Sequence, residues 1–270
     1  MRNFIYLRKS CDWAKSKCIE DYKNQNKDSR ILMKNWMPDL IRAIEIWNNT
    51  FNLSFYQIRD SIKKISLDSI RSLNVEIFDK DRVGELLNKN DFLLYISDDD
   101  DWVQKEIFSI IEQRFIKSVG LYIWPTYRLS CKSKIHSLDS DVDGIRWTYT
   151  NNCIITKNVF DELYARTKSW EFLENHRFMD ENVQSFEKYL IPNFCMSVYN
   201  QTPASATKLW STVQICDSDK KIKKCLIETV ERYKSSINKN ILPQETKWCE
   251  KYLIEYINLL NSLNCKKIKI

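Results

Sequence analysis

The chain has 270 residues, a net charge of +6 and 13% aromatic residues. Its length is sufficient to bury a core, and its aromatic content is that of a globular protein and not of a disordered one. Its 3 glycines and 5 prolines are too few for a turn-rich all-β fold, and it has no GxGxxG or GxxxxGK[ST] phosphate loop. The nine cysteines include no CxxC pair, so we expect reduced thiols in a cytoplasmic protein. We expect neither a signal peptide nor a membrane-spanning helix, because no stretch approaches the apolar length required.

Strands and helices are predicted to alternate along most of the chain. Short apolar runs bounded by polar residues predict strands, at residues 4–7, 53–58, 74–78, 92–96, 119–124, 147–149, 153–156 and 194–199. Apolar residues at helical spacing predict helices, at residues 38–47 (with Pro38 in the first turn), 60–73, 81–87, 103–115, 159–164 and 180–189. This alternation predicts an α/β fold with a mostly parallel sheet flanked by helices.

The chain from Asp219 onward is predicted to be helical to its end. We therefore divide it into residues 1–212, a catalytic domain, and residues 213–270, a C-terminal helical extension. Lysines gather in this extension, at Lys220, Lys221, Lys223, Lys224 and near the C-terminus. Such a basic stripe is either a solvated helix face, a contact with an anionic membrane surface or a nucleic-acid site.

Four consecutive aspartates, Asp98, Asp99, Asp100 and Asp101, follow the apolar strand at residues 92–96 almost directly. In open α/β sheets ligands bind beyond the carboxyl ends of strands. Mg²⁺ or Mn²⁺ would relieve the repulsion between these carboxylates and could hold a diphosphate at the same time. The alternative is a solvated acidic turn that caps a helix starting near Val103.

The run Leu-Leu-Tyr-Ile-Ser-Asp-Asp-Asp-Asp-Trp that ends at Trp102 resembles the nucleotide-sugar half of GT-A glycosyltransferases. Residues 150–156 are similar to the strand beneath the acceptor pocket, and residues 178–182 are similar to an acidic pair that opens the next helix. Residues 197–205 resemble the late strand and polar turn of bacterial rhamnosyltransferase-like, family-2-like members. The resemblance covers residues 1–212 and implies a GT-A-like (Rossmann-like) fold. Two departures are Asn151-Asn152 in place of a Gly-rich strand, and Asn200 and Thr202 in place of a late histidine, so we expect no metal ligand in that late turn.

The resemblance implies a nucleotide-sugar co-substrate of the UDP, GDP or dTDP type. Asp98, Asp99 and Asp100 would bind it, and Asp100 and Asp101 would hold Mn²⁺ or Mg²⁺. It also implies a metal-dependent, inverting transfer of a hexosyl or deoxyhexosyl group to a glycan or lipid-linked acceptor in surface polysaccharide synthesis. An inverting transfer needs a carboxylate base, for which the candidates are Asp180 or Glu181 at a predicted helix start, with Asp143 in reserve; ordinary helix capping is their alternative role.

Trp124, Trp147 and Tyr149 could stack on a sugar or a base, or pack in the core. Arg128 and Arg146 could bind a diphosphate. We expect a cytoplasmic enzyme with a possible peripheral contact at the inner membrane surface and no nucleic-acid partner. The alternative functions are a metal-dependent nuclease or phosphotransferase, or a non-enzymatic basic binding module.

Overall fold

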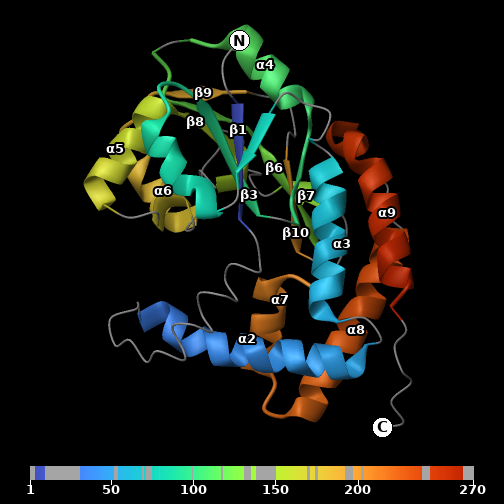
Figure 1. Cartoon of the computed structure of the whole chain (residues 1–270). Helices are drawn as coiled ribbons and strands as arrows, with labels where there is room; N and C mark the ends of the chain where they lie inside the picture. Colours follow the sequence, from blue (N-terminus) through green and yellow to red (C-terminus); the bar gives the residue numbers. More distant parts are fainter. Residues whose placement is uncertain are drawn as a thin grey trace.

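The structure is a computed structural model of the whole chain (Figure 1). The residues that it describes are 4–9, 31–51, 54–68, 70, 75–78, 80–98, 100–116, 118–130, 135–137, 150–168, 171–173, 176–191, 197–201, 204–238 and 244–263.

The main sheet has six strands in the order β2-β1-β3-β8-β5-β9. Their bounds are β1 Phe4–Lys9, β2 Val75–Phe78, β3 Leu93–Asp98, β5 Leu121–Ile123, β8 Cys153–Thr156 and β9 Lys188–Leu190. β8 runs antiparallel to both of its neighbours, and the other strands share one direction. The predicted α/β class, a mostly parallel sheet flanked by helices with helices at the C-terminus, is confirmed.

Both faces of the central strands are covered, and successive side chains of each strand point to opposite faces. Along β3, Leu93 and Tyr95 pack with α4 (Glu106–Arg114) on one face. Leu94 and Ile96 pack on the other face with α5 (Lys157–Thr167), the short turn η3 (Glu171–Leu173) and α6 (His176–Asn182). A strand covered on both sides reads as a continuous apolar run, which is why this strand was visible in the sequence.

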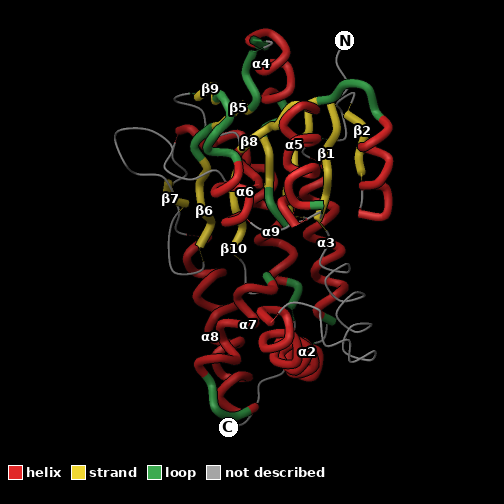
Figure 2. The backbone as a smooth tube through the Cα atoms, turned by 90° about the vertical axis from the view of Figure 1, so that its left-hand side faces the viewer, coloured by secondary structure: helices red, strands yellow, loops and turns green. Residues whose placement is uncertain are grey.

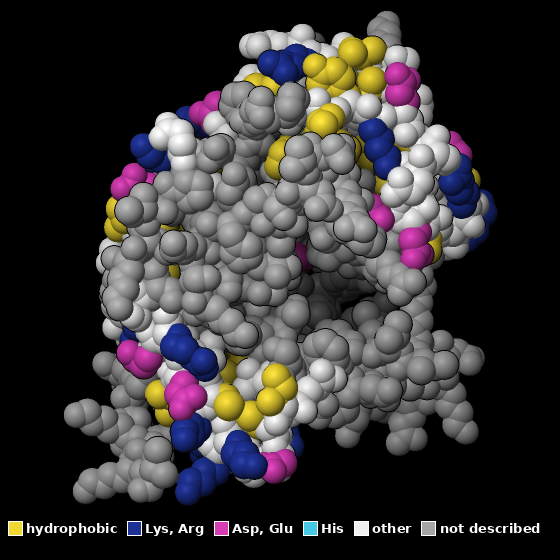
Figure 3. All heavy atoms as spheres, turned by 180° about the vertical axis from the view of Figure 1, so that it is seen from behind, with side chains coloured by type: hydrophobic (Ala, Val, Ile, Leu, Met, Phe, Trp, Pro, Cys, Tyr) yellow, Lys and Arg dark blue, Asp and Glu magenta, His cyan; other side chains and the backbone are white. Residues whose placement is uncertain are grey.

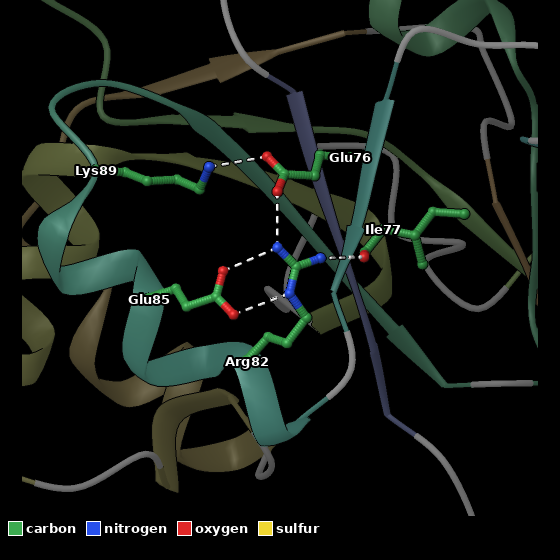
Figure 4. A network of polar contacts seen from close by, with 5 residues as sticks. All are labelled: Glu76, Ile77, Arg82, Glu85 and Lys89. Atoms are coloured by element: carbon green, nitrogen blue, oxygen red, sulfur yellow. Dashed lines mark hydrogen bonds and ion pairs between the residues drawn. The ribbon is translucent and has the colours of Figure 1, made fainter.

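The edge strand β2 is covered by a network of ion pairs with the 3₁₀ helix η1 (Lys80–Asn88) (Figure 4). Arg82 contacts the Glu76 carboxylate at 2.9 Å and the Glu85 carboxylate at 2.8 Å, and it also donates to the backbone oxygen of Ile77. Lys89 contacts the other Glu76 oxygen at 2.8 Å. Charged side chains along an edge strand oppose pairing with a second sheet.

A second, smaller sheet has the order β4-β10-β6-β7. Its strands are β4 Trp102–Val103, β6 Thr126–Ser130, β7 Ile135–Ser137 and β10 Ser197–Gln201. β4 pairs antiparallel with β10 directly after the aspartate run, with Trp102 opposite Val198 and Val103 opposite Ser197. The second sheet therefore fixes the chain on the far side of the aspartates.

A group of helices borders the sheets: in Figure 1, α2, α7 and α8 lie below them, and α3 and α9 run alongside them (Figures 1 and 2). It consists of α2 Ile31–Thr50, α3 Phe55–Asp68, α7 Ala206–Ile215, α8 Asp219–Asn238, η4 Gln244–Cys249 and α9 Glu250–Asn261. The helices at the C-terminus share one apolar core with α2 and α3. The division into residues 1–212 and 213–270 stays a prediction. Within the described chain, no helix has both the length and the hydropathy to cross a bilayer.

Several of the predicted elements are wrong in type or extent. Residues 53–58 are not a strand but the start of α3. Ser54 and Gln57 form a reciprocal capping box there: the Ser54 amide donates to Gln57 Oε1 at 2.9 Å, and the Gln57 amide donates to Ser54 Oγ at 3.1 Å. Pro38 lies inside α2, which begins seven residues earlier, at Ile31, and not in its first turn.

The remaining errors concern segments near the predicted site residues. The helix predicted from Val103 begins at Glu106, because Trp102 and Val103 are held in β4 by β10. The helix predicted at residues 180–189 does not exist as such: α6 ends at Asn182, and residues 188–190 form β9, which pairs with β5. The predicted polar turn at residues 200–203 is wrong for Asn200 and Gln201, which belong to β10. The predicted strand 147–149, the loop aspartate Asp143 and Thr202 lie outside the described residues.

Candidate functional site

The aspartate run begins where the order of the main sheet reverses. β2 follows β1 in the chain and pairs on one side of it, whereas β3, the next strand, pairs on the other side. Lys9 and Asp98 are register partners at the carboxyl ends of β1 and β3. In open α/β sheets the crevice at such a switch point is the usual position of a bound ligand.

The carboxyl end of β1 points toward the helices that lie below the sheets (Figure 1). Seen from behind, Lys and Arg side chains lie among Asp and Glu side chains over the described part of the surface (Figure 3). Asp98 closes β3 and is partly exposed. The alternation along β3 places it on the same face as Leu94 and Ile96, which is the face that α5 and α6 cover.

Asp100 is buried beside an arginine from a distant helix. Its residue is 6% exposed, and its Oδ2 accepts a hydrogen bond from Arg59 Nη1 of α3 at 2.5 Å. The Arg59 side chain is 7% exposed. A buried carboxylate is costly unless it is paired, so this contact is what allows Asp100 to turn inward.

Asp101 is held from the other side of the turn by an asparagine. Asn151, in the short 3₁₀ turn η2 (Thr150–Asn152), donates through Nδ2 to Asp101 Oδ2 at 2.8 Å, and both residues are 2% exposed. The backbone oxygen of Asn151 accepts a hydrogen bond from the Tyr95 hydroxyl at 3.1 Å. Burial raises the pKa of Tyr95 well above its ordinary value, so the hydroxyl stays protonated and remains a donor.

Trp102 anchors the end of the turn to the C-terminal helices. Its indole is 1% exposed and packs against two rings of α9, with centroids 6.1 Å from Tyr252 and 6.0 Å from Tyr256. The turn that starts at Asp98 is therefore fixed by β3, α3, η2 and α9 together. Three contacts from separate elements, together with β3, hold the turn in one arrangement.

The carboxylates suit a hard cation. Their oxygen donors are those that Mg²⁺ and Mn²⁺ prefer. Among the described residues, which do not include Asp99, no group of three or more His, Cys, Asp or Glu side chains is arranged to hold a metal alone. Mg²⁺ needs only one or two protein carboxylates when a diphosphate supplies further oxygens. Of the three described aspartates of the run, Asp98 is the partly exposed one, whereas Asp100 and Asp101 are buried with Oδ2 hydrogen-bonded to Arg59 and Asn151.

The predicted catalytic pair lies on α6, separate from the turn. Asp180 is 8% exposed and its Oδ1 accepts a hydrogen bond from Gln184 Nε2 at 3.2 Å, whereas Glu181 is exposed. Neither residue opens a helix, because α6 begins at His176. The capping role that was their alternative is thus excluded. Met179 and Val183 place α6 on the face of the sheet that Asp98 shares.

The predicted aromatic and arginine contacts have different outcomes. Trp124 is fully buried, with its ring centroid 5.9 Å from that of Tyr95, and is a core residue. Arg146, Trp147 and Tyr149 lie outside the described residues, as does the side chain of Arg128.

The basic C-terminal helices combine a solvated face and a core face. Lys221 contacts Asp217 at 2.7 Å and Lys224 contacts Glu228 at 3.9 Å, and all four side chains are exposed. Tyr252, by contrast, is 9% exposed and packs into the helical core. Tyr252 and Tyr256 of α9 are therefore core residues.

Two residues of the site were not predicted from the sequence. Arg59 lies on the apolar face of α3, between the buried Ile58 and Ile62, and the wrong strand at residues 53–58 concealed that pattern. A single arginine on an apolar helix face would have indicated a buried partner. Asn151 lies in the segment 150–156, which resembles the strand beneath the acceptor pocket. No local sequence pattern connects it to Asp101.

A cavity of about 350 Å³ lies near the amino end of β3, at the other end of this strand from the aspartate turn. Its lining runs from Asp91, before β3, to Thr156 and Lys157, between β8 and α5. Thr156 pairs with Leu93 at the amino end of β3. This cavity is therefore remote from the aspartate turn and contributes none of the predicted site residues.

Comparisons with known proteins find only distant likenesses. No model of a known protein family matches the chain. A search of curated proteins finds no match. Among solved structures, S. aureus TarS 1–349 aligns with 96% of this chain and 71% of its own at 11% identity and a TM-score of 0.38. The same protein in complex with UDP-GlcNAc aligns with 96% of this chain and 72% of its own at 10% identity and a TM-score of 0.39. Likenesses at these TM-scores are too distant to carry an argument about the activity of this chain.

Proposed function

We propose that this protein is a glycosyltransferase that moves a hexosyl or deoxyhexosyl group from a nucleotide sugar to a glycan or lipid-linked acceptor in surface polysaccharide synthesis. The observation that carries the proposal is the position of the aspartate turn. Asp98 ends β3 at the switch point of the sheet, where ligands bind in α/β folds. Asp100 and Asp101 follow in the same turn, fixed by Arg59 and Asn151.

In this proposal Asp98, Asp99 and Asp100 bind the nucleotide part of a UDP, GDP or dTDP sugar, and Asp100 and Asp101 hold Mg²⁺ or Mn²⁺. A divalent cation neutralises the charge that develops on the leaving diphosphate. The clamped turn keeps its carboxylates in place before the ligand arrives, so little reorganisation accompanies binding.

The transfer is proposed to be inverting, which requires a carboxylate to take the proton of the acceptor hydroxyl. Asp180 and Glu181 on α6 are the proposed bases, since α6 covers the face of the sheet to which Asp98 belongs. Asp180 is the buried member and Glu181 the exposed member of this pair. Replacing each in turn by its amide would identify the base as the one whose loss lowers turnover and leaves donor binding intact.

The protein is proposed to act in the cytoplasm, with the exposed lysines of α8 touching the inner membrane surface where a lipid-linked acceptor would lie. Anionic headgroups attract such lysines by about 1 kcal/mol each near the surface. Flotation with anionic and with neutral vesicles tests this part of the proposal, and equal recovery of the protein with both would refute it.

The function is tested by ligand-dependent thermal stability. Wild-type protein is heated with UDP, GDP, dTDP and UDP-GlcNAc, with and without MnCl₂, together with Asp98→Asn and Asp100→Ala. A ligand that binds only the native state raises the midpoint by mass action. Asp91→Asn is the matched control, because Asp91 is an exposed aspartate just before the other end of β3.

We expect a manganese-dependent shift with one nucleotide, retained in Asp91→Asn and lost in Asp98→Asn. Asp98→Asn is the more informative variant, because Asp100→Ala also leaves the Arg59 charge buried. If no nucleotide shifts the wild-type midpoint at millimolar ligand and metal, the glycosyltransferase proposal fails. Metal-dependent cleavage of a nucleic acid by the wild type, lost in Asp98→Asn, would instead identify a nuclease.

A further inference from the structure

We propose that Arg59 is a positioning residue for the aspartate turn: it acts through Asp100 to set the geometry in which the turn meets a nucleoside diphosphate. This inference rests on the proposed function, and it adds a residue that was not predicted from the sequence. It also gives Asp100 a second role: through the contact between Asp100 and Arg59, α3 fixes the geometry of the turn.

The placement of Arg59 is costly unless it serves such a contact. The residues around it on α3 are apolar: Phe55, Ile58, Ile62 and Ile65 are all buried in the helical core. Arg59 is itself 6% exposed. A guanidinium in such a position loses its hydration and needs a nearby anion in compensation. Asp100 Oδ2, 2.5 Å from Arg59 Nη1, supplies that anion.

The pair determines which way the turn faces. With Asp100 drawn toward α3 by Arg59, and Asp101 drawn toward η2 by Asn151, the turn is clamped from two sides. Asp98, before the clamp, keeps its place at the exposed end of β3. The Arg59 charge also reduces the repulsion among neighbouring carboxylates, so that the turn can be formed before a cation arrives.

The test is a double-mutant cycle read out by ligand affinity. Wild type, Arg59→Met, Asp100→Asn and the double variant are titrated calorimetrically with UDP, GDP and dTDP in MnCl₂, and their folding is monitored by circular dichroism. Arg82→Met is the matched control, because Arg82 also pairs with carboxylates but lies in the network on β2 and η1 (Figure 4). Arg59→Lys, which keeps the charge, is included as the conservative variant, and it replaces Arg59→Met if that variant does not fold.

We expect Arg59→Met to raise the Kd of the nucleotide bound in MnCl₂ by about tenfold or more, since loss of a residue that orients a metal-binding carboxylate typically costs roughly 10–100-fold in affinity. Arg59→Lys should recover part of the loss, and Arg82→Met should bind as the wild type does. In the Asp100→Asn background, Arg59→Met should cause no further loss, because the two residues act as one unit.

Three results would overturn the inference. A Kd unchanged in folded Arg59→Met would show that the pair only stabilises the fold. A loss that persists in the Asp100→Asn background would show that Arg59 contacts the ligand itself. A wild type that binds none of the nucleotides would refute the proposed function and this inference with it, whereas either of the first two results would leave the proposed function standing.

Discussion

The hydrogen bond from Asn151 to Asp101 gives a sharp test of how the turn is held. Replacing Asn151 by alanine removes the Nδ2 donor that lies 2.8 Å from Asp101 Oδ2, at a position where both residues are 2% exposed. It leaves the backbone oxygen that accepts from Tyr95 unchanged. Hydrogen bonds to charged groups contribute about 1.5–3 kcal/mol. We therefore expect Asn151→Ala to lower the free energy of unfolding by about 2 kcal/mol.

The assay is urea unfolding followed by circular dichroism, with free energies obtained by linear extrapolation. Asn182→Ala is the matched control, because Asn182 Nδ2 donates at 2.9 Å to an uncharged acceptor, the backbone oxygen of Phe178. A neutral hydrogen bond contributes about 0.5–1.5 kcal/mol, so the control should cost less. A loss in Asn151→Ala no larger than that in Asn182→Ala would refute the view that Asn151 stabilises a buried carboxylate.

Three further predictions concern the sheet. Gly120→Ala should destabilise the fold by about 1–3 kcal/mol in urea unfolding, because its Cβ would lie 2.8 Å from Val159 Cγ2; an unchanged midpoint would contradict this. The hydrogen bond from Lys89 lowers the pKa of Glu76, so the stability that this contact contributes is present above the ordinary carboxyl pKa of about 4.3 and is lost as the pH falls through the lower, folded value. The stability difference between wild type and Lys89→Met should accordingly shrink on acidification below about pH 4. Burial raises the pKa of Cys153 to about 12, so iodoacetamide at pH 8 should modify it only in urea, as peptide mass spectrometry would show.

Several features of the fold and the site could be predicted from local sequence patterns. The strand ending at Asp98 was visible because both of its faces are buried, which makes its residues continuously apolar. The C-terminal helices were visible from their helical apolar spacing. The start of α3 was missed although the capping pair Ser54 and Gln57 was present in the sequence, since the alternating residues that follow also fit a short strand.

The sequence by itself determined that a run of aspartates follows a buried strand in an α/β fold, because burial and alternation act over a few residues. Only the tertiary structure decided which partners those aspartates have. Arg59 lies 41 residues before Asp100, and Asn151 lies 50 residues after Asp101. No local propensity brings such residues together. Their contacts depend on how α3 packs beside the sheets and how η2 enters β8, and that is set by the shared apolar cores and strand register of the whole chain.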